Sequence, residues 1–583
     1  SLNLPRSTRT IRASVIRLGT RTADDNDDHI DRGGETTTGD SSIGLYIHIP
    51  YCRQRCRYCD FAIVPIGDKK LETSSNGNDK GRREQGFLRM NERYVSAIVA
   101  ELKHIANIKS DGHKIPLRSV YFGGGTPSLA PIESIAKILY HACGPDNPEA
   151  PFRLVQQEQE HDSNDRTGGN VATTEITMEM DPGTFDRDHL SSLRALGINR
   201  ISLGVQSFDD DILTAMGRTH RRADILQAIQ DITFVYGKEK YGTTDYDKVN
   251  YSIDLISGCP GLTPAKWAET LEEATTGVHM KKTITNNEQT PLLLSSLPAP
   301  KHISVYDMQI EDGTVFGKWA AKAKAEAAAK RETSDPEAGL DEDEDDDDIS
   351  RQFTVALPIE GPNQGGKQRI LRLPTEDECG FMYKYAAGYL RAKRYEHYEV
   401  SSYAAFEDKE KDQPIHDKHE NSTEQSTRCT SKRSRHNQIY WEYNGQWHAV
   451  GLGATSFVNK KMLARPREMS DYLDWVKKLK DSDMPNANKE EHIKEHEGDP
   501  DEDFLTDLLL KRLRTIDGLD LAWLESHYGS EVVRDVLGGA QLGLELGLAE
   551  RTEENVLRLT DPDGLLYSNF IISSIFAELG FTA

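Results

Sequence analysis

The sequence has few cysteines, no long apolar run and no excess of basic residues. Seven of its 583 residues are Cys, an odd number that does not form the disulfide framework of a small secreted domain. No run of about 18 apolar residues occurs, so we expect no transmembrane helix. Hydrophobic residues make up 37% of the chain and the mean hydropathy is −0.63, low for a chain folded throughout its length. We therefore expect dense apolar blocks separated by polar stretches.

Acidic residues dominate the charge, since 95 Asp and Glu stand against 71 Lys and Arg, a formal charge of −24. This balance argues against a general nucleic-acid binder, and we expect no nucleic-acid partner. Blocks of like charge repel each other and rarely order, and residues 341–348 are eight acids in succession. We interpret residues 320–375 as an acidic disordered insert. Four further polar stretches are interpreted as solvated inserts: 67–90, 145–173, 275–297 and 407–433.

The first 42 residues differ from the rest of the chain. They contain five Arg before residue 22, many Ser and Thr, and no acid before Asp24. This composition is typical of an organellar transit peptide, followed here by a disordered linker that ends at residue 42. The alternative interpretation is a merely disordered basic tail. We expect mitochondrial localisation, with the plastid or the cytoplasm as alternatives.

Short apolar runs recur from residue 43 onward, and each ends in Gly, Pro or polar residues. Their length and their β-branched composition predict buried strands. Helical patterns between them, such as residues 94–105 and 189–197, predict a parallel sheet. Six strand–helix units indicate a barrel or partial barrel over residues 43–319, with its chemistry at the carboxyl ends of the strands. The predicted strands are 44–50, 119–127, 175–183, 200–208, 251–261 and 302–310.

Two further regions follow the predicted barrel. Helical spacing of apolar residues from Phe381 to Leu390, and the specific-looking block HNQIYW (436–441), indicate that residues 376–480 complete the barrel. Leu-rich helical spacing and a segment typical of a short hairpin predict a small helical, winged-helix-like domain over residues 500–583.

Cys52, Cys56 and Cys59 form a C-x3-C-x2-C motif directly after the first predicted strand. Thiolates are soft ligands that favour zinc, copper(I) or iron–sulfur clusters. Structural zinc takes four protein ligands, and His48 and Asp60 are the nearby residues that would complete such a set. Three thiolates at this spacing suit three irons of a 4Fe–4S cluster and leave the fourth iron for another ligand. We therefore favour the cluster over zinc.

This motif resembles that of the radical S-adenosylmethionine (SAM) superfamily. Further blocks extend the resemblance to the coproporphyrinogen-dehydrogenase family and, within it, to the HemW-type haem chaperones. It covers residues 43–583 outside the inserts, and it implies an α/β fold: a radical SAM partial TIM barrel, (β/α)6, followed by a HemN-like C-terminal domain. The blocks are YIHIPYCRQRCRYCDF (46–61), GGGTPS (123–128), GVQSF (204–208), GRTH (217–220) and IDLISGCPG (253–261).

The resemblance also implies two cofactors. A 4Fe–4S cluster on the three cysteines would bind SAM through its free iron, and one electron from an external donor would cleave the sulfonium bond to a 5′-deoxyadenosyl radical. The glycine turn would contact the SAM amino group, although each polar residue taken singly also has a structural interpretation. The cofactor-binding residues expected by this analogy are Tyr46, Tyr58, Gly124, Gly125, Thr126, Glu179, Gln206, Arg218 and Asp254.

His436 opens a block that matches the HNxxYW motif, proposed in HemW-type proteins as a haem contact. A neutral imidazole can ligate haem iron, and Tyr440 and Trp441 would pack on the macrocycle. The alternative is that His436 and Asn437 hydrogen-bond a loop against the barrel. The resemblance thus implies haem as bound cargo, passed to haem-accepting proteins such as respiratory cytochromes.

Two functions in haem metabolism stay open, besides a purely structural zinc or scaffold protein. The first is a haem chaperone, and the second is an oxygen-independent coproporphyrinogen III oxidase, which converts two propionates to vinyl groups. The oxidases carry a further cysteine two positions after the third, where this chain has Phe61. This difference favours the chaperone. Asp181, which follows Glu179 and Met180, is closer to the oxidase pattern and points the other way.

Overall fold

The computed structural model describes the barrel, the region after it and the C-terminal domain. The transit peptide and linker predicted over residues 1–42 lie outside the described residues, as do residues 341–348 and most of the insert 407–433. The described residues are 43–67, 77–108, 113–155, 173–237, 249–276, 297–333, 353–358, 368–406, 432–482 and 500–581.

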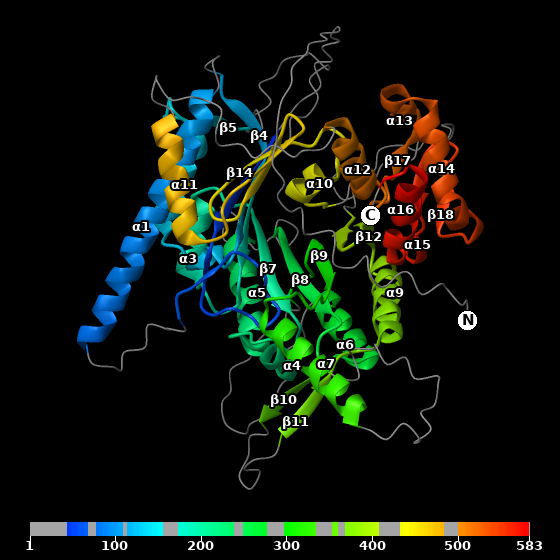
Figure 1. The fold of residues 1–583 in the computed structure, drawn as a ribbon. Coiled ribbons are helices and arrows are strands. Elements are labelled where there is room, and N and C mark those ends of the chain that lie inside the picture. Colours follow the sequence, from blue (N-terminus) through cyan, green and yellow to red (C-terminus); the bar gives the residue numbers. More distant parts are fainter. Residues whose placement is uncertain are drawn as a thin grey trace, which may run out of the picture.

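The described residues contain one large mixed sheet of twelve strands, with helices packed against it (Figure 1). At its centre six parallel strands pair in the order of the sequence, which confirms the predicted partial barrel. All six predicted strands are present, and their boundaries differ from the prediction by a few residues. The parallel strands are β1 (Ile43–Ile49), β4 (Ile115–Gly124), β6 (Glu175–Met180), β7 (Arg200–Gln206), β8 (Tyr251–Ser257) and β9 (His302–Asp307).

Strands from the second half of the chain extend this sheet on both sides. Beyond β9 the sheet continues with antiparallel strands, and beyond β1 it continues with β14, which pairs with β1 in parallel. A short strand, β5 (Phe152–Leu154), pairs with the start of β4. The extending strands are β13 (Ser402–Ala405) and β12 (Tyr395–Glu399) on one side, and β14 (Trp447–Val450), β15 (Thr455–Val458) and β16 (Lys461–Ala464) on the other.

Alternation along the strands separates an apolar face from a polar one. Leu45 and Ile47 of β1 are fully buried in one apolar cluster with Leu102, and each such burial contributes about 1.5–3 kcal/mol. The alternate residues, such as Tyr46 and Tyr121, point to the opposite face, inside the barrel.

The helices that flank the sheet are α1 (Gly77–Ile108), α2 (Ile132–Cys143), α3 (Arg187–Ala195), α4 (Asp210–Ala215), α5 (Arg222–Tyr236), α6 (Pro264–Thr275), α9 (Glu376–Ala392) and α11 (Met469–Ser482).

A second apolar cluster, which includes Leu509, Leu557 and Ile575, forms the core of the C-terminal domain. Its helices accompany a small antiparallel sheet in the order β17-β19-β18 (orange and red in Figure 1). This arrangement confirms the predicted small helical, winged-helix-like domain. Its elements are α12 (Pro500–Arg512), β17 (Leu519–Asp520), α13 (Leu521–Tyr528), α14 (Ser530–Glu545), β18 (Ala549–Arg551), β19 (Val556–Leu559), α15 (Asp563–Leu566) and α16 (Ser568–Glu578).

The prediction that residues 320–375 form a disordered insert is wrong at both ends of that range. A helix continues into it from the barrel, and two of its segments pair as antiparallel strands. Phe353 and Leu371 are buried in an apolar cluster with Phe316. The acidic run between these segments dominates the composition of residues 320–375. The apolar residues on either side of it were therefore not recognised as ordered structure. The elements are α7 (Val315–Thr333), β10 (Thr354–Pro358) and β11 (Gln368–Arg372).

Two deletions distinguish the acidic run from the paired strands. We expect removal of residues 341–348 to leave the melting temperature unchanged, because eight like charges offer no apolar surface to the core. Removal of residues 320–375 should lower it by several degrees, because it uncovers Phe316 and removes the hydrogen bond from Gly261 N–H to Arg372 O (2.7 Å). Thermal unfolding of both variants tests this, and equal melting temperatures would contradict a packing role for β10 and β11.

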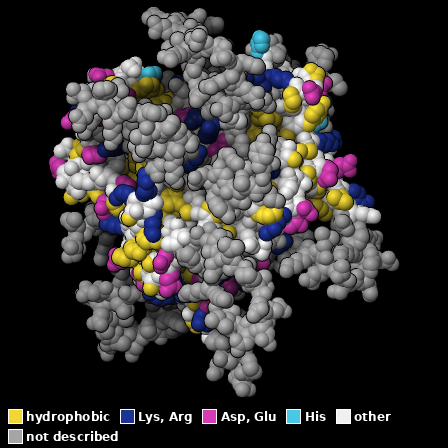
Figure 2. Space-filling model, turned by 180° about the vertical axis from the view of Figure 1, so that it is seen from behind, with side chains coloured by type: hydrophobic (Ala, Val, Ile, Leu, Met, Phe, Trp, Pro, Cys, Tyr) yellow, Lys and Arg dark blue, Asp and Glu magenta, His cyan; other side chains and the backbone are white. Residues whose placement is uncertain are grey.

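The described helices include none that is long and apolar enough to cross a membrane. On the face drawn in Figure 2, Lys and Arg side chains are interspersed with Asp, Glu and apolar side chains. The described side chains of this face therefore form no large positive area of the kind that nucleic acid requires.

Candidate functional site

The cysteine loop leaves the end of β1 and lies at the carboxyl ends of the central strands. Cys52 ends the short strand β2 (Tyr51–Cys52), which pairs with β3 (Val64–Pro65). Cys56 and Cys59 follow in the connection between these two strands, and the Cys59 N–H donates to Cys56 O (3.2 Å). The three cysteines therefore share one compact loop.

Arginines of the same loop hold it in place. The Arg57 main-chain N–H donates to Met216 O (3.0 Å), and its guanidinium donates to Ala215 O (2.9 Å). The Arg55 guanidinium donates to Phe61 O (3.0 Å). The loop is thus fixed by contacts that do not use the three thiols, which leaves the thiols for a ligand.

The three thiols are half-buried and free of disulfides. Arg218 donates to Cys56 Sγ (3.4 Å), and Thr126 Oγ1 to Cys52 Sγ (3.6 Å). Burial raises the pKa of the Cys52 thiol to about 12 and also raises the pKa of Cys59, so both need a cationic partner to ionise. Three soft ligands on one loop, two of them facing hydrogen-bond donors, fit the 4Fe–4S cluster that the resemblance implies.

The two residues that would complete a zinc site, His48 and Asp60, are already bonded to other protein groups. The two ring nitrogens of His48 lie 2.8 Å from Ala62 O and 3.2 Å from the Tyr46 hydroxyl. Asp60 pairs with Arg467 on the surface (3.2 Å). Among the described residues, no group of three or more His, Cys, Asp and Glu side chains, the three cysteines included, is placed to hold a single metal ion. The donor set therefore fits a cluster bound by three thiolates better than a four-ligand zinc ion.

Arg218 connects the cysteine loop to the strand ends. Its guanidinium lies 2.5 Å from Asp181 Oδ1, 3.2 Å from Gly204 O and 3.3 Å from the Tyr58 hydroxyl. The Arg218 side chain is only 8% exposed, so these contacts form at a low effective dielectric constant. The resemblance placed Arg218 among the expected cofactor-binding residues, and the structure bonds it to protein groups beside Cys56.

The glycine turn at the end of β4 presses against the cysteine loop. Gly124 has a φ of +112°, and a Cβ there would lie 2.4 Å from the His48 ring. A Cβ at Gly125 would lie 2.7 Å from the main chain of Pro50, and the Gly125 N–H donates to Ile49 O (2.8 Å). Glycine is therefore required at both positions, and the turn brings bare main chain to the expected cofactor site.

Two half-buried carboxyl groups face the interior near this turn. Glu179 accepts from the Tyr121 hydroxyl (2.8 Å) and from the Gly124 N–H (3.0 Å), and Asp254 accepts from Ser202 Oγ (3.2 Å). Burial, followed by the charge of Asp254, raises the pKa of Glu179 to about 7, and burial also raises the pKa of Asp254. A bound cation would relieve both shifts, and SAM carries an ammonium and a sulfonium group. The acids at these positions therefore fit SAM.

Gln206 ends β7 in a strained conformation. Its φ is +66°, a region that residues other than glycine rarely occupy, and the pairing of β7 with β8 shifts in register at this point. Within the described part of the chain, its side-chain amide takes no hydrogen bond. Strained backbone of this kind concentrates at functional sites. Gln206 is thus placed to donate to, or accept from, a ligand.

The structure gathers most of the predicted SAM residues at one end of the barrel. Tyr46 stacks on Tyr121, with ring centroids 6.1 Å apart, and it points into the interior from β1. The predicted residues at or beyond the carboxyl ends of the strands are Tyr58, Gly124, Gly125, Thr126, Glu179, Gln206 and Arg218, whereas Tyr46 and Asp254 lie in the middle of β1 and β8.

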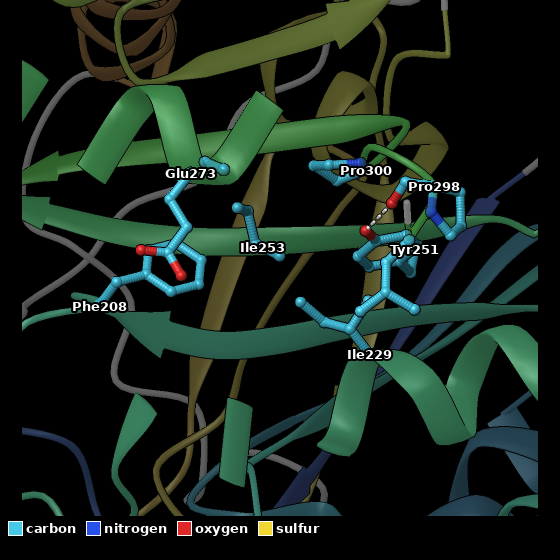
Figure 3. A pocket seen from close by; sticks show the side chains of 9 residues that line it. Phe208, Ile229, Tyr251, Ile253, Glu273, Pro298 and Pro300 are labelled. Atoms are coloured by element: carbon cyan, nitrogen blue, oxygen red, sulfur yellow. Dashed lines mark hydrogen bonds between the residues drawn. The ribbon is translucent and has the colours of Figure 1, made fainter. Parts of the chain in front are cut away.

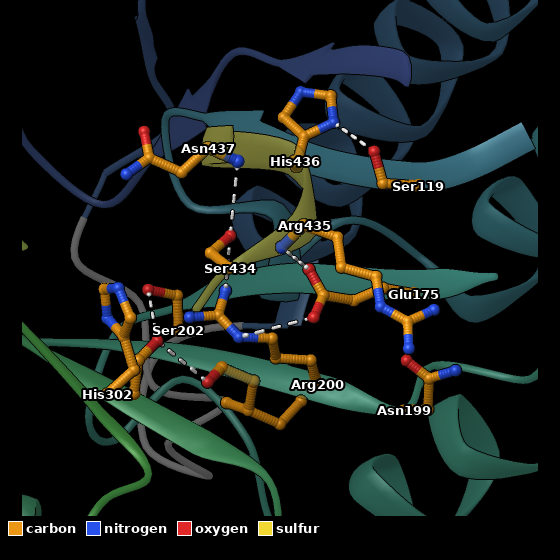
Figure 4. A network of polar contacts seen from close by, with 12 residues as sticks. Ser119, Glu175, Asn199, Arg200, Ser202, His302, Ser434, Arg435, His436 and Asn437 are labelled. Carbon is orange, nitrogen blue, oxygen red and sulfur yellow. Dashed lines mark hydrogen bonds and ion pairs between the residues drawn. The ribbon is translucent and has the colours of Figure 1, made fainter. Parts of the chain in front are cut away.

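Helix α10 (Arg435–Trp441) lies at the other end of the interior, and a polar network anchors it there (Figure 4). Arg200 donates to Ser434 Oγ (3.3 Å), and Glu175 accepts from the Arg435 main-chain N–H (3.0 Å). Arg200 and Glu175 form a buried ion pair at 4.0 Å. The HNQIYW block therefore closes the interior near the amino-terminal ends of the strands.

His436 lies inside this closure and is only 2% exposed. Its Nδ1 is 2.8 Å from Ser119 Oγ, and its Nε2 is 2.9 Å from the Tyr440 hydroxyl. Burial lowers the pKa of His436 to about 3, so the ring is neutral at physiological pH. Both ring nitrogens are thus hydrogen-bonded within the protein, as in the structural alternative for this residue, and the haem contact at His436 stays a prediction.

Cavities of very different size lie among the described residues of the barrel. One of about 10 Å³, next to Phe208, Ile229 and Tyr251, has room for no more than a single water molecule (Figure 3). The other, of about 310 Å³, lies beside the cysteine loop and extends from Tyr46 to Phe61. The second has the size of a ligand site.

Sequence reasoning left Asp181, Tyr121 and Arg467 out of the site. Asp181 is the first residue after β6, and its place at a strand end, two residues after Glu179, is a signal that would have found it. Tyr121 follows from alternation along β4. Arg467 belongs to no motif, and only the folded chain brings it to the cysteine loop.

The raised pKa of Glu179 predicts that SAM binds more tightly at pH 8 than at pH 6. With a pKa near 7, Glu179 is about 10% ionised at pH 6 and about 90% at pH 8, and only the ionised form attracts the ammonium. The same shift makes the free energy of unfolding fall as the pH rises from about 4.5 through 7. His48 and His220, each with a pKa lowered to about 4 by burial, stay neutral between pH 6 and pH 8.

Calorimetric titration of the anaerobic, cluster-loaded protein with SAM at pH 6, 7 and 8 measures this effect. Glu179→Gln is the control variant, because the amide keeps the shape but cannot ionise, and its SAM affinity should not change with pH. An equal pH dependence in both proteins would assign the effect to another group.

Three comparisons place the chain among known proteins. Residues 46–274 match the radical SAM superfamily. The haem chaperone HemW of Synechocystis sp. is 31% identical over 548 residues, 92% of this chain and 96% of that protein. The mitochondrial radical S-adenosyl methionine domain-containing protein 1 of Mus musculus is 28% identical over 39% of each chain. The solved structure of the coproporphyrinogen III oxidase HemN from Escherichia coli covers 92% of this chain at a TM-score of 0.53 and 17% identity, which shows a shared fold.

Proposed function

Because this chain belongs to the HemW family of radical SAM proteins, we propose that it is a haem chaperone, which binds haem and delivers it to acceptor proteins. The observation that carries the proposal is the cavity beside the cysteine loop, with Phe61 at its edge. In the resembling oxidases a further cysteine stands at the position of Phe61. An exposed aromatic ring there favours the binding of an apolar cargo over the oxidase alternative.

The cysteine loop and the strand ends would hold the two cofactors of this family. Cys52, Cys56 and Cys59 would bind a 4Fe–4S cluster, which supplies one electron to SAM when it is bound. Glu179 and Asp254 would attract the cationic groups of SAM. Arg218 would offset the charge of the thiolates and keep the loop against the strand ends.

The test compares haem binding with oxidase activity in one preparation. Anaerobic, cluster-loaded protein is titrated with haem, and a portion is incubated with SAM, a reductant and coproporphyrinogen III before chromatography of the tetrapyrroles. The expected result is one haem per chain and unchanged coproporphyrinogen III. Protoporphyrinogen formed in multiple turnovers would replace the chaperone with the oxidase.

The delivery step and the location are part of the same proposal. The mitochondrial names of several relatives and the Arg-rich start of this chain support a mitochondrial site of action. A respiratory cytochrome would then serve as the haem acceptor, and a redox partner would reduce the cluster. Mixing the haem-loaded protein with a haem-free cytochrome, followed by separation of the two proteins, measures the transfer.

A further inference from the structure

We propose that the cavity beside the cysteine loop holds one edge of the tetrapyrrole, with its aromatic walls on the macrocycle and Arg467 on a propionate. This inference rests on the proposed function and assigns its cargo site. It moves the haem contact away from His436, whose nitrogens are both bonded, and places Tyr440 of the same block at the cavity instead.

The walls of the cavity come from several parts of the chain. Tyr46 extends from β1, Tyr440 from α10 and Trp447 from β14, and Phe61 follows the cysteine loop. Thr455 adds to the wall from β15. The parallel pairing of β1 with β14 brings these elements together, so the cavity forms only when both halves of the chain are folded.

The polar atoms of two aromatic walls are already hydrogen-bonded within the protein. The Trp447 Nε1–H donates to Thr455 O (2.8 Å), and the Tyr440 hydroxyl bonds to His436 Nε2 (2.9 Å). The rings of Tyr440 and Trp447 meet edge to face, with centroids 4.6 Å apart. Because their hydrogen-bonding atoms are occupied, these rings present carbon surface. Carbon surface of this shape suits a flat aromatic macrocycle.

Arg467 is the one cationic side chain among the residues that line the cavity. Its side chain is 57% exposed and pairs with Asp60, which is 51% exposed, through Nη2. A guanidinium has five N–H donors in a planar fork, so a second carboxylate can bind while Asp60 stays in place. Haem carries two propionates on one edge of an otherwise apolar ring. The aromatic wall and the single guanidinium match that distribution.

The size of the cavity fits partial enclosure of the cargo. The cavity volume of about 310 Å³ is at the lower end of the range for small-molecule sites, which is about 300 to 1,000 Å³. A tetrapyrrole is too large to be enclosed completely in a cavity of this volume. Phe61, 67% exposed, continues the wall out to the surface. The remaining part of the macrocycle would stay accessible, as transfer to an acceptor requires.

The test uses three cavity variants of the cluster-loaded full chain. Thr455→Trp fills the cavity and should weaken haem binding at least about tenfold. Phe61→Ala and Arg467→Gln change exposed side chains that the fold does not need, and each should weaken it about threefold to fivefold. The controls are Phe381→Ala, another exposed aromatic residue, and Arg534→Gln, another exposed Arg paired with Asp, which should bind as the natural protein does.

A second ligand tests whether Arg467 acts on the propionates of haem. Iron octaethylporphyrin has the same macrocycle but no carboxylates, so Arg467→Gln should leave its affinity unchanged, while Thr455→Trp should weaken it as it weakens haem binding. Wild-type haem affinity in all three cavity variants would overturn the assigned site and leave the chaperone function standing. Failure of the natural chain to bind haem would overturn the proposed function and this inference together.

Discussion

Cys56→Ser is expected to abolish assembly of the iron–sulfur cluster while the protein stays folded. A serine hydroxyl is a hard, weakly acidic ligand that does not replace a thiolate on iron. The loop itself should persist, because Arg57 and Arg55 fix it through main-chain carbonyl groups. Anaerobic reconstitution followed by iron analysis and visible absorbance measures the cluster, and circular dichroism measures the fold.

Cys379→Ser is the matched control. Cys379 is also half-buried, but it lies on α9, away from the loop. The control should assemble about four irons per chain, as the natural protein does. If Cys56→Ser also kept about four irons, Cys56 would not be a cluster ligand.

Arg218→Met is expected to lower the free energy of unfolding of the cluster-free protein by about 3 kcal/mol. The substitution leaves the Asp181 carboxylate, which is 25% exposed, without its partner. It also removes the donors to Tyr58 and to Gly204 O. Chemical denaturation of the natural protein and the variant measures the difference.

Two further variants separate the ion pair from simple loss of packing. Arg218→Met combined with Asp181→Asn should recover part of the stability, since no unpaired charge stays behind. Arg534→Met removes an exposed Arg–Asp pair and should change stability by less than about 1 kcal/mol. A double variant as unstable as the sum of the two single variants would mean that Arg218 and Asp181 do not stabilise each other.

The six parallel strands and the C-terminal domain could be predicted because their signals are local. A run such as 251–257 alternates apolar residues with small or acidic ones and is followed by Gly, so its conformation depends little on distant residues. The cysteine motif and the acids at strand ends are local in the same sense. Parallel topology then brings residues as distant as Glu179 and Asp254 together inside the barrel.

Features that depend on distant contacts could not be predicted. Nothing in the sequence around Arg467 indicates that it meets Asp60 in the cysteine loop. His436 was expected to contact a ligand because its motif can be recognised in the sequence, whereas its surroundings cannot. Its bonds to Ser119 and Tyr440 become visible only once α10 lies across β1 and β4.

The pairing of β1 with β14 has a consequence for synthesis of the chain. Gly44 lies beside Trp447 in the sheet, so one edge of the first strand stays open until about 400 further residues have been translated. During that interval a strand rich in buried apolar residues presents unsatisfied main-chain groups to any other nascent chain. A ribosome-associated chaperone would therefore matter most for this protein before β14 emerges, and a transcript truncated upstream of it would yield an aggregating product.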